Sequence, residues 1–116
     1  MNISPSGENK FLVRGFKNRQ ALLNHWQNGR THNEEYPDFT MAQYEQRALE
    51  LLEQPTDKNI LGHIDKSGYI TRYDKENNDF AKGHPYKGIV TMFKPIDGLN
   101  YYFRALKGDL EHGGRN

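Results

Sequence analysis

Hydrophobic positions in the first half of the chain recur with the spacing of an α-helix. An apolar stripe in residues 17–27 predicts a first helix, formed around Ala21, Leu22, Leu23 and Trp26. Asn28-Gly29 would end it, because glycine accepts the left-handed conformation that follows a last helical turn. Residues 30–39 carry no periodic pattern and are expected to form a loop.

A second helix is predicted from Met41 to about Glu53. Thr40 stands at the N-cap position, and Gln43, three residues later, would complete a capping box. Pro55 follows the expected end of the helix and cannot continue it. The buried face of this helix is expected to comprise Met41, Tyr44, Ala48, Leu51 and Leu52.

After residue 58 the pattern changes to alternation with a period of two, which is typical of strands. Four strands are predicted, at residues 59–65, 69–74, 78–82 and 88–94. Residues 66–68 are expected to form a hairpin turn, and Asn78 tolerates the positive φ of a tight turn. The alternation places Tyr69, Thr71 and Tyr73 on one face of the second strand, and Ile89, Thr91 and Phe93 on one face of the fourth.

Helices followed by a meander of strands predict an α+β fold, with the N-terminal helices packed on one face of a four-stranded antiparallel sheet. We expect the other face to be open and a single domain to span residues 11–106. Flexible segments are expected at residues 1–10 and 107–116. Residues 11–16 would form a strand or a docking arm, and the aromatic run 100–104 a short element on the sheet.

Charge and composition narrow the range of functions. The 116 residues carry a net charge of +1, but residues 58–107 hold nine Lys and Arg against five Asp and Glu, so this half is favoured for an anionic partner. The absence of cysteine excludes disulfides, thiolate catalysis and Cys-based zinc sites. No apolar run is long enough to span a bilayer, and the first ten residues lack the apolar core of a signal peptide.

Candidate chemistry is limited to a few side chains, since no phosphate-binding glycine loop, nucleophile elbow or familiar metal-ligand spacing is present. His25 and His32 stand seven residues apart and form a candidate acid–base pair. Arg72 is unusual because a guanidinium within a strand must either face solvent or meet a partner, such as an anion. His63, His84 and His112 have no distinctive context.

Acid–base cleavage of RNA would use these groups without a metal. A base takes the proton of the ribose 2′-OH, an acid protonates the leaving 5′-oxygen, and cations or donors hold the charged phosphorane. The histidines suit the proton transfers, whereas Arg72, Lys94 and Thr91 suit the phosphate. Aromatic side chains that could stack on splayed bases are Tyr73, Tyr86, Phe93 and Tyr102, although each is more often a core or rim residue.

An ordered set of short motifs over about residues 20–104 resembles a bacterial polymorphic-toxin nuclease family. The motifs are Leu23-Asn-His-Trp26, His32-Asn-Glu-Glu-Tyr-Pro37, Gln43-Tyr44, Ala48, Gly68, Arg72-Tyr73-Asp74, Asn78-Asp-Phe-Ala81, Gly88, Thr91, Phe93-Lys-Pro95 and Tyr101-Tyr-Phe103. They are similar to C-terminal toxin domains of contact-dependent growth inhibition systems, in the group of barnase, EndoU, colicin and RelE nucleases.

The resemblance implies a barnase-like fold and a metal-independent endoribonuclease without cofactors. It further implies cleavage of tRNA to 2′,3′-cyclic phosphate and 5′-OH ends. By the same resemblance, His25, His32, Arg72 and Thr91 are the catalytic candidates. Tyr73, Asn78, Lys94 and Tyr102 are the substrate-binding candidates.

The implied partners are an RNA substrate and a cognate immunity protein, with a host protein cofactor as a further candidate. Such a toxin would be delivered as the C-terminal part of a larger surface protein and act in the cytoplasm of a target cell. The alternative is a non-catalytic α+β module that binds RNA or protein through an open sheet face.

Overall fold

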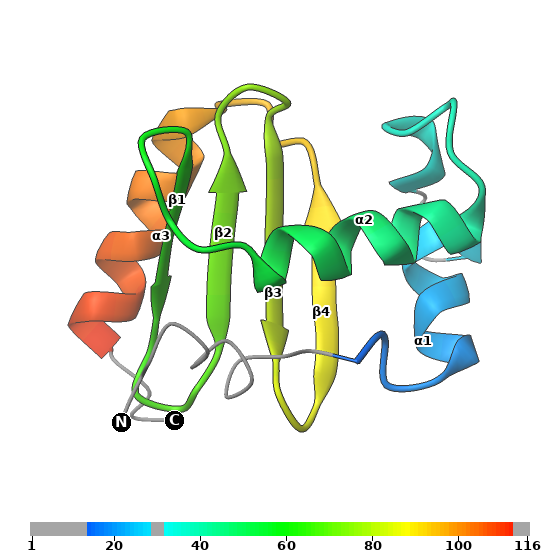
Figure 1. Ribbon diagram of the computed structural model, residues 1–116, viewed down its shortest axis with the longest axis horizontal. Helices are drawn as coiled ribbons and strands as arrows, with labels where there is room; N and C mark the ends of the chain where they lie inside the picture. The colour runs from blue at the N-terminus through cyan, green and yellow to red at the C-terminus, as the bar shows by residue number, and fades with distance from the viewer. Residues whose placement is uncertain (1–13, 29–31, 113–116) are drawn as a thin grey trace.

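A computed structural model of the chain describes residues 14–28 and 32–112 and shows an α+β fold. The chain runs through α1 (Arg19–Leu23), a π-helical turn (Asn24–Asn28), a 3₁₀ turn (His32–Glu34) and α2 (Met41–Glu53). The strands are β1 (Ile60–Ile64), β2 (Ile70–Asp74), β3 (Asp79–His84) and β4 (Gly88–Phe93), followed by α3 (Leu99–His112). Figure 1 shows these elements in order along the colour ramp.

The strands form one antiparallel sheet in the order β1-β2-β3-β4, as the alternating pattern predicts. The hairpin turn before β2 is confirmed, since the Gly68 amide donates to the Asp65 carbonyl at 3.0 Å and Gly68 has a φ of +92°. Asn78 takes a φ of +57° in the β2–β3 turn, again as expected. Each strand therefore pairs with its neighbour in sequence, and the sheet is a meander.

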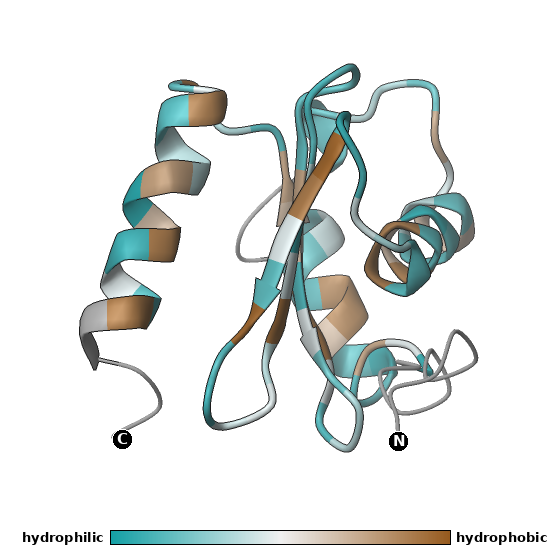
Figure 2. Cartoon of the chain, turned by 60° about the vertical axis from the view of Figure 1, so that its left-hand side comes forward, coloured by the Kyte–Doolittle hydropathy of each residue, from teal (hydrophilic) through white to brown (hydrophobic). Residues whose placement is uncertain are grey.

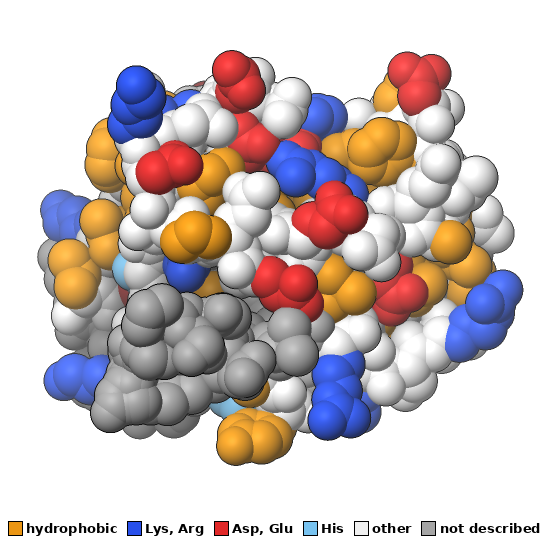
Figure 3. Space-filling view, viewed as in Figure 1, with side chains coloured by type: hydrophobic (Ala, Val, Ile, Leu, Met, Phe, Trp, Pro, Cys, Tyr) orange, Lys and Arg blue, Asp and Glu red, His pale blue; other side chains and the backbone are white. Residues whose placement is uncertain are grey.

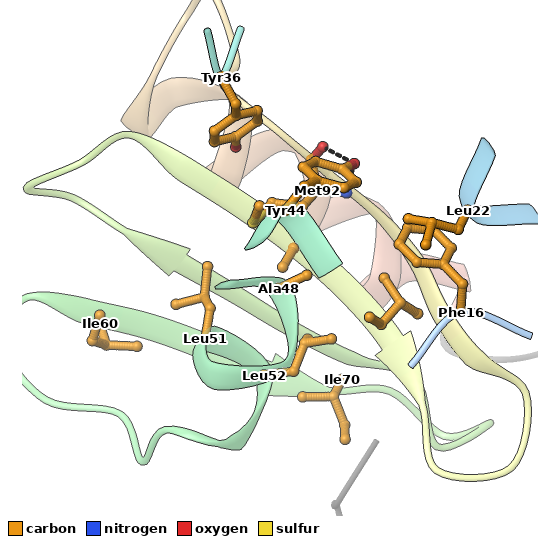
Figure 4. Packing of buried hydrophobic residues seen from close by; sticks show 12 residues of the cluster. Phe16, Leu22, Tyr36, Tyr44, Ala48, Leu51, Leu52, Ile60, Ile70 and Met92 are labelled. Atoms are coloured by element: carbon orange, nitrogen blue, oxygen red, sulfur yellow. Dashed lines mark hydrogen bonds between the residues drawn. The ribbon is translucent and has the colours of Figure 1, made fainter. Parts of the chain in front are cut away.

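Helix α2 crosses one face of the sheet and forms the main core with it (Figure 1). The predicted capping box is present, because the Thr40 hydroxyl accepts from the Gln43 amide while the Gln43 side chain accepts from the Thr40 amide. The buried face includes Tyr44, whose hydroxyl donates to the Met92 carbonyl of β4 at 2.6 Å (Figure 4). This bond joins the helix to the sheet within a close-packed apolar layer.

Helix α3 packs on the opposite face of the sheet, so the fold has three layers (Figure 2). Its side chains Tyr101, Tyr102, Ala105 and Leu106 join a second apolar cluster with residues of the strands. The expectation of an open second face is therefore wrong for the part that α3 covers. The expected flexible tail is also wrong over residues 107–112, which continue the helix, and residues 113–116 lie outside the described part.

A β-bulge changes one expected assignment of faces. Lys82 pairs with Thr91 but Gly83 pairs with Ile89, so Val90 is an extra residue in β4. Ile89 consequently lies in the α2 core together with Met92, whereas the alternation had placed it beside Thr91. The predicted faces of the second strand are confirmed, with Tyr73 in the α3 cluster and Ile70 in the α2 core.

The N-terminal segment differs from expectation in detail. The first helix begins after an Asn18 N-cap, and from Asn24 it widens into a π-helical turn that reaches Asn28. Phe16 forms an isolated parallel bridge with Ile89 at the edge of β4. The predicted lead-in at 1–10, residues 11–13 and the helix stop at Gly29 lie outside the described residues. Within residues 14–28 and 32–112, no helix combines the length and apolar character needed to cross a membrane.

Candidate functional site

One row of polar side chains runs across all four strands on the face that carries α3. Successive pairings join His63 to Thr71, Thr71 to Lys82, and Lys82 to Thr91. Directly opposed residues in an antiparallel sheet point to the same face with their Cβ atoms about 5 Å apart. These four residues, hereafter the polar row, thus span the sheet over about 14 Å, given strand spacings of about 4.8 Å.

The neighbouring row on the same face is apolar and holds α3. Cross-strand pairing aligns Leu61 with Tyr73, Tyr73 with Phe80, and Phe80 with Phe93. This row packs against the aromatic turn of α3, with Tyr101 meeting the rings of Phe80 and Phe93 edge-on at 5.0 and 5.3 Å. The apolar row therefore seats the helix and leaves the polar row beneath the second half of α3.

Asp109 of α3 reaches down to the polar row and binds His63. The Asp109 carboxylate lies 2.7 Å from Nε2 of His63, whose Nδ1 lies 3.1 Å from the Tyr102 hydroxyl. Burial raises the pKa of the Tyr102 hydroxyl above its ordinary value, so this group stays protonated at neutral pH. Neutral His63 is satisfied when Tyr102 donates to Nδ1 and Nε2–H donates to Asp109, which orients the carboxylate.

The position of Asp109 is electrostatically unfavourable for the helix alone. It stands in the last turn of α3, where unsatisfied carbonyls concentrate negative charge and an acidic side chain is destabilising. Its second oxygen, Oδ1, points toward Lys82, with 4.0 Å between Oδ1 and Nζ. His63 and Lys82 of the polar row thus offset the unfavourable position of this carboxylate.

Lys82 brings a weakly paired cation to the middle of the polar row. Within the described part of the chain its ammonium makes no hydrogen bond, and its nearest carboxylate oxygen is that of Asp109 at 4.0 Å. Nζ also lies 5.3 Å from the centre of the Tyr69 ring. An ammonium group has three donors, so Lys82 retains the capacity to bind an anion.

The hydroxyl of Thr71 is the second polar group with unused hydrogen-bonding capacity. Thr71 is only 1% exposed, and its Oγ1 has no hydrogen-bond partner among the described residues. Buried hydroxyls nearly always have a partner, because an unsatisfied one destabilises the fold. Such an orphaned hydroxyl beside a weakly paired lysine is the arrangement expected of a binding site for an oxygen-rich anion.

These side chains border a hollow of about 430 Å³ between α3 and the strands. Its polar end is formed by Thr71, Lys82, Thr91 and Asp109, and its aromatic end by Phe80, Phe93 and Tyr101, with Ala105 and Gly108 along the helix. The volume falls within the range of small-ligand sites. The donor-rich end and the aromatic end together suit a phosphorylated ligand with a flat ring.

Two of the sequence-predicted catalytic residues, Arg72 and Thr91, lie on opposite faces of the sheet. Thr91 belongs to the polar row, whereas Arg72 lies on the α2 face and is 8% exposed. The Arg72 guanidinium donates to the backbone carbonyls of Gln54 and Thr71 at 2.9 and 3.0 Å. A Cβ at Gly62, directly opposite on β1, would collide with it, so the glycine makes room for this buried cation.

One histidine of the helical region, His25, also lies away from Thr91. His25 is part-buried on the α2 side, where its ring lies 5.2 Å from that of Phe16 and its Nδ1 lies 3.2 Å from the Ala21 carbonyl. His32 begins the 3₁₀ turn, and its side chain is outside the described part of the structure.

The predicted substrate-binding residues divide between the two faces. Tyr73 and Tyr102 stack at 6.1 Å within the cluster beneath α3, and the Tyr73 hydroxyl donates to Asn78 at 2.6 Å. The Asn78 amide in turn donates to the Pro95 carbonyl, so it fixes the β2–β3 turn. Lys94 lies on the α2 side and pairs with Asp79 at 2.8 Å. Tyr102 contacts the polar row directly, through its hydrogen bond to His63.

Sequence reasoning missed His63, Thr71, Lys82 and Asp109 as functional candidates. The sequence pattern held no signal for their alignment, because the hairpin registers that join the first three to Thr91 emerge only in the structure. Asp109 had no local signal, since it meets His63 across 46 positions of sequence. Among the described residues, no group of three or more His, Asp and Glu side chains is placed to hold a metal ion.

Comparison with known proteins assigns no family or function to this chain. No protein-family model and no curated protein matches this chain. The chemistry of the polar row is therefore inferred from its own residues.

Proposed function

We propose that this protein is a metal-independent endoribonuclease whose active site is the polar row beneath α3. The observation that carries the proposal is the meeting of a weakly paired ammonium, an orphaned buried hydroxyl and an oriented carboxylate in one hollow. RNA cleavage by attack of its own 2′-OH needs phosphate binding, donors for the phosphorane, a proton acceptor and a proton donor, and the ammonium can serve as that donor.

The phosphate is bound at the polar end of the hollow. Lys82 supplies the positive charge, and the hydroxyls of Thr71 and Thr91 flank it on the neighbouring strands. Groups fixed on strands do not have to reorganise as negative charge develops on the phosphorane, which makes their stabilisation of the transition state efficient. Thr71 then gains the hydrogen bond that it lacks within the described chain.

Asp109 is the proton acceptor in this proposal. Its Oδ2 is held by His63, while Oδ1 lies in the hollow opposite Lys82. His63 and Tyr102 act as positioning residues, because they fix the carboxylate without lining the hollow themselves. A carboxylate aimed by a second group is a common way to orient a general base.

In the proposed reaction Asp109 accepts one proton and Lys82 donates one. The 2′-O–H bond breaks as its proton passes to Asp109, and the new 2′-O–P bond forms. The P–O5′ bond breaks as Lys82 protonates the departing 5′-oxygen, which leaves a 2′,3′-cyclic phosphate and a 5′-OH end. Exchange with solvent then takes the proton from Asp109 and returns one to Lys82, which restores both groups.

The biological setting is proposed from the resemblance to polymorphic-toxin nucleases. In that setting the domain has a barnase-like fold, cleaves tRNA in a target cell, and is held inactive in its producer by a cognate immunity protein. A balanced net charge of +1 gives no strong attraction to RNA at a distance, so selection of the RNA depends on the fit at the hollow.

Cleavage of purified total RNA in excess EDTA tests the proposal. We expect discrete cuts whose fragments are captured by a sequencing method that requires cyclic-phosphate ends. Asp109→Asn should slow the cleavage by about 10²- to 10⁴-fold, the usual contribution of a general base. Asp97→Asn is the matched control, since Asp97 pairs with Arg104 in an exposed ion pair and does not line the hollow.

The alternative of a non-catalytic binding module predicts a different result. RNA would stay intact in the presence of folded protein, and Asp109→Asn would change RNA binding without changing any fragment pattern. Cleavage that requires added Mg²⁺ would also contradict the proposed chemistry.

A further inference from the structure

We infer, building on the proposed function, that the hollow is a one-nucleotide subsite that selects RNA with an unpaired base at the cut. The phosphate of that nucleotide occupies the polar end, and its base stacks against the part-exposed rings of Phe93 and Tyr101. The site would then act on single-stranded or looped RNA and reject a continuous duplex, in which bases are stacked and paired.

The polarity of the hollow matches the two ends of a nucleotide. Thr71, Lys82 and Thr91 lie on one side, and the next apolar row places Phe80 and Phe93 beside them. Along β3 and β4 the two ends are two residues apart, or about 7 Å at about 3.4 Å per residue. Tyr101 closes the aromatic end from α3, with its ring nearly perpendicular to that of Phe93 at 82°.

Gly108 adds to the room for a ligand in the hollow. A glycine in a helix is destabilising relative to alanine, and α3 places it in the wall of the hollow. Apart from the adjacent residues and the backbone of α3 itself, a Cβ built on Gly108 has no described atom within 4 Å, so packing does not require a glycine there. The missing side chain instead keeps open the space between α3 and the strands.

Binding of cytidine 3′-monophosphate, ribose 5-phosphate and inorganic phosphate, measured by NMR titration, tests the subsite directly. We expect the nucleotide to bind more tightly than the two ligands without a base. Phe93→Leu should weaken nucleotide binding by about tenfold, the effect of losing one stacking contact, while phosphate binding stays the same. The matched control is Phe103→Leu, because Phe103 is half-exposed on α3 and does not line the hollow.

Gly108→Ala provides a second test that does not depend on the folding of Phe93→Leu. The methyl group should raise the melting temperature, because alanine favours the helix, and should still weaken nucleotide binding by narrowing the hollow. Tight nucleotide binding that survives both Phe93→Leu and Gly108→Ala would overturn the subsite.

The two proposals fail in different ways. Nucleotide binding that responds to Phe93→Leu, without cleavage of any RNA, would uphold the subsite and overturn the nuclease. Equal cleavage of a single strand and of its duplex, with no effect of Phe93→Leu, would uphold the nuclease and overturn the subsite.

Discussion

At the scale of single residues, Asp74 is a heavily hydrogen-bonded side chain of the α2 face. Its carboxylate accepts from Arg47 at 2.6 Å, from the Asn59 and Asn77 side chains, and from the backbone amides of Glu76 and Asn77. Burial alone would raise the pKa of Asp74, but these donors outweigh it and lower the pKa below its ordinary value. Asp74 thus ties α2 to the β2–β3 turn.

The lowered pKa makes the contribution of Asp74 dependent on pH. Because the folded state holds the proton less tightly than the unfolded state, this stability is present above the ordinary pKa of about 4 and is lost as pH falls through the folded value. Asp74→Asn should lower the free energy of unfolding by about 1–3 kcal/mol at pH 7. Urea unfolding from pH 7 to pH 2 should show this difference shrinking in acid, and a constant difference would contradict the assignment.

Thr71 should show opposite effects on stability and on activity. Thr71→Val replaces a buried hydroxyl that has no partner among the described residues by a methyl group of similar size. We expect the free energy of unfolding to rise by about 1 kcal/mol, since an unsatisfied polar group is removed, while RNA cleavage slows. Denaturant unfolding and initial cleavage rates measure the two effects. A loss of stability would show that the hydroxyl is already satisfied.

Residue-level prediction from the sequence succeeds where the signal is local. Asn78 is expected to accept a positive φ and does so. Arg72 is unusual on sequence alone, but its acceptors are backbone carbonyls, one of which comes from the loop after α2. His63 carries no local signal, because its partners Tyr102 and Asp109 are 39 and 46 positions away.

At the scale of elements, α2 is predictable from Met41 to Glu53, because the capping box and the apolar spacing agree on a helix there. Helix α3 is not predictable from the sequence, since the run Tyr101-Tyr102-Phe103 has a strand-like composition and Gly108 lowers the helix propensity. What stabilises α3 is tertiary packing of Tyr102 and Ala105 against a sheet face that the sequence pattern was expected to leave open. The polar row likewise emerges only when the hairpin registers are known.

The docking of α3 can be tested through Tyr102, which is 3% exposed. Tyr102→Ala removes its packing on Tyr73 and its bond to His63, and should lower the free energy of unfolding by about 3 kcal/mol. Hydrogen exchange should show that α3 amides lose more protection than α2 amides. Leu110→Ala is the control, because Leu110 is 75% exposed, and equal losses in both variants would contradict the packing of α3 on the sheet.

At the scale of the whole molecule, charge is distributed without a dominant field. Acidic and basic side chains are interspersed on the face that carries α2 (Figure 3). The sequence indicates an excess of positive charge in residues 58–107, and Lys82 and Lys87 of that half lie 5.3 and 5.4 Å from the Tyr69 ring centre. Under the proposed function, recognition of RNA would therefore depend on a local site rather than on long-range attraction.

The three-layer arrangement separates two groups of candidate catalytic residues. His25 and Arg72 lie on the α2 side of the sheet, whereas Lys82, Thr91 and Asp109 meet on the α3 side. One sheet stands between the two groups, so a single phosphate cannot contact both. We therefore assign the proposed chemistry to the α3 side.

The most direct measurement is single-turnover cleavage of an unstructured RNA in excess EDTA by three forms of the protein. The wild-type chain and His25→Gln should cleave at the same rate, because His25 contacts Phe16 on the opposite side of the sheet from the hollow. Asp109→Asn should be slower by about 10²- to 10⁴-fold while remaining folded. Loss of cleavage in His25→Gln together with full activity in Asp109→Asn would contradict the proposed site and place catalysis on the α2 side.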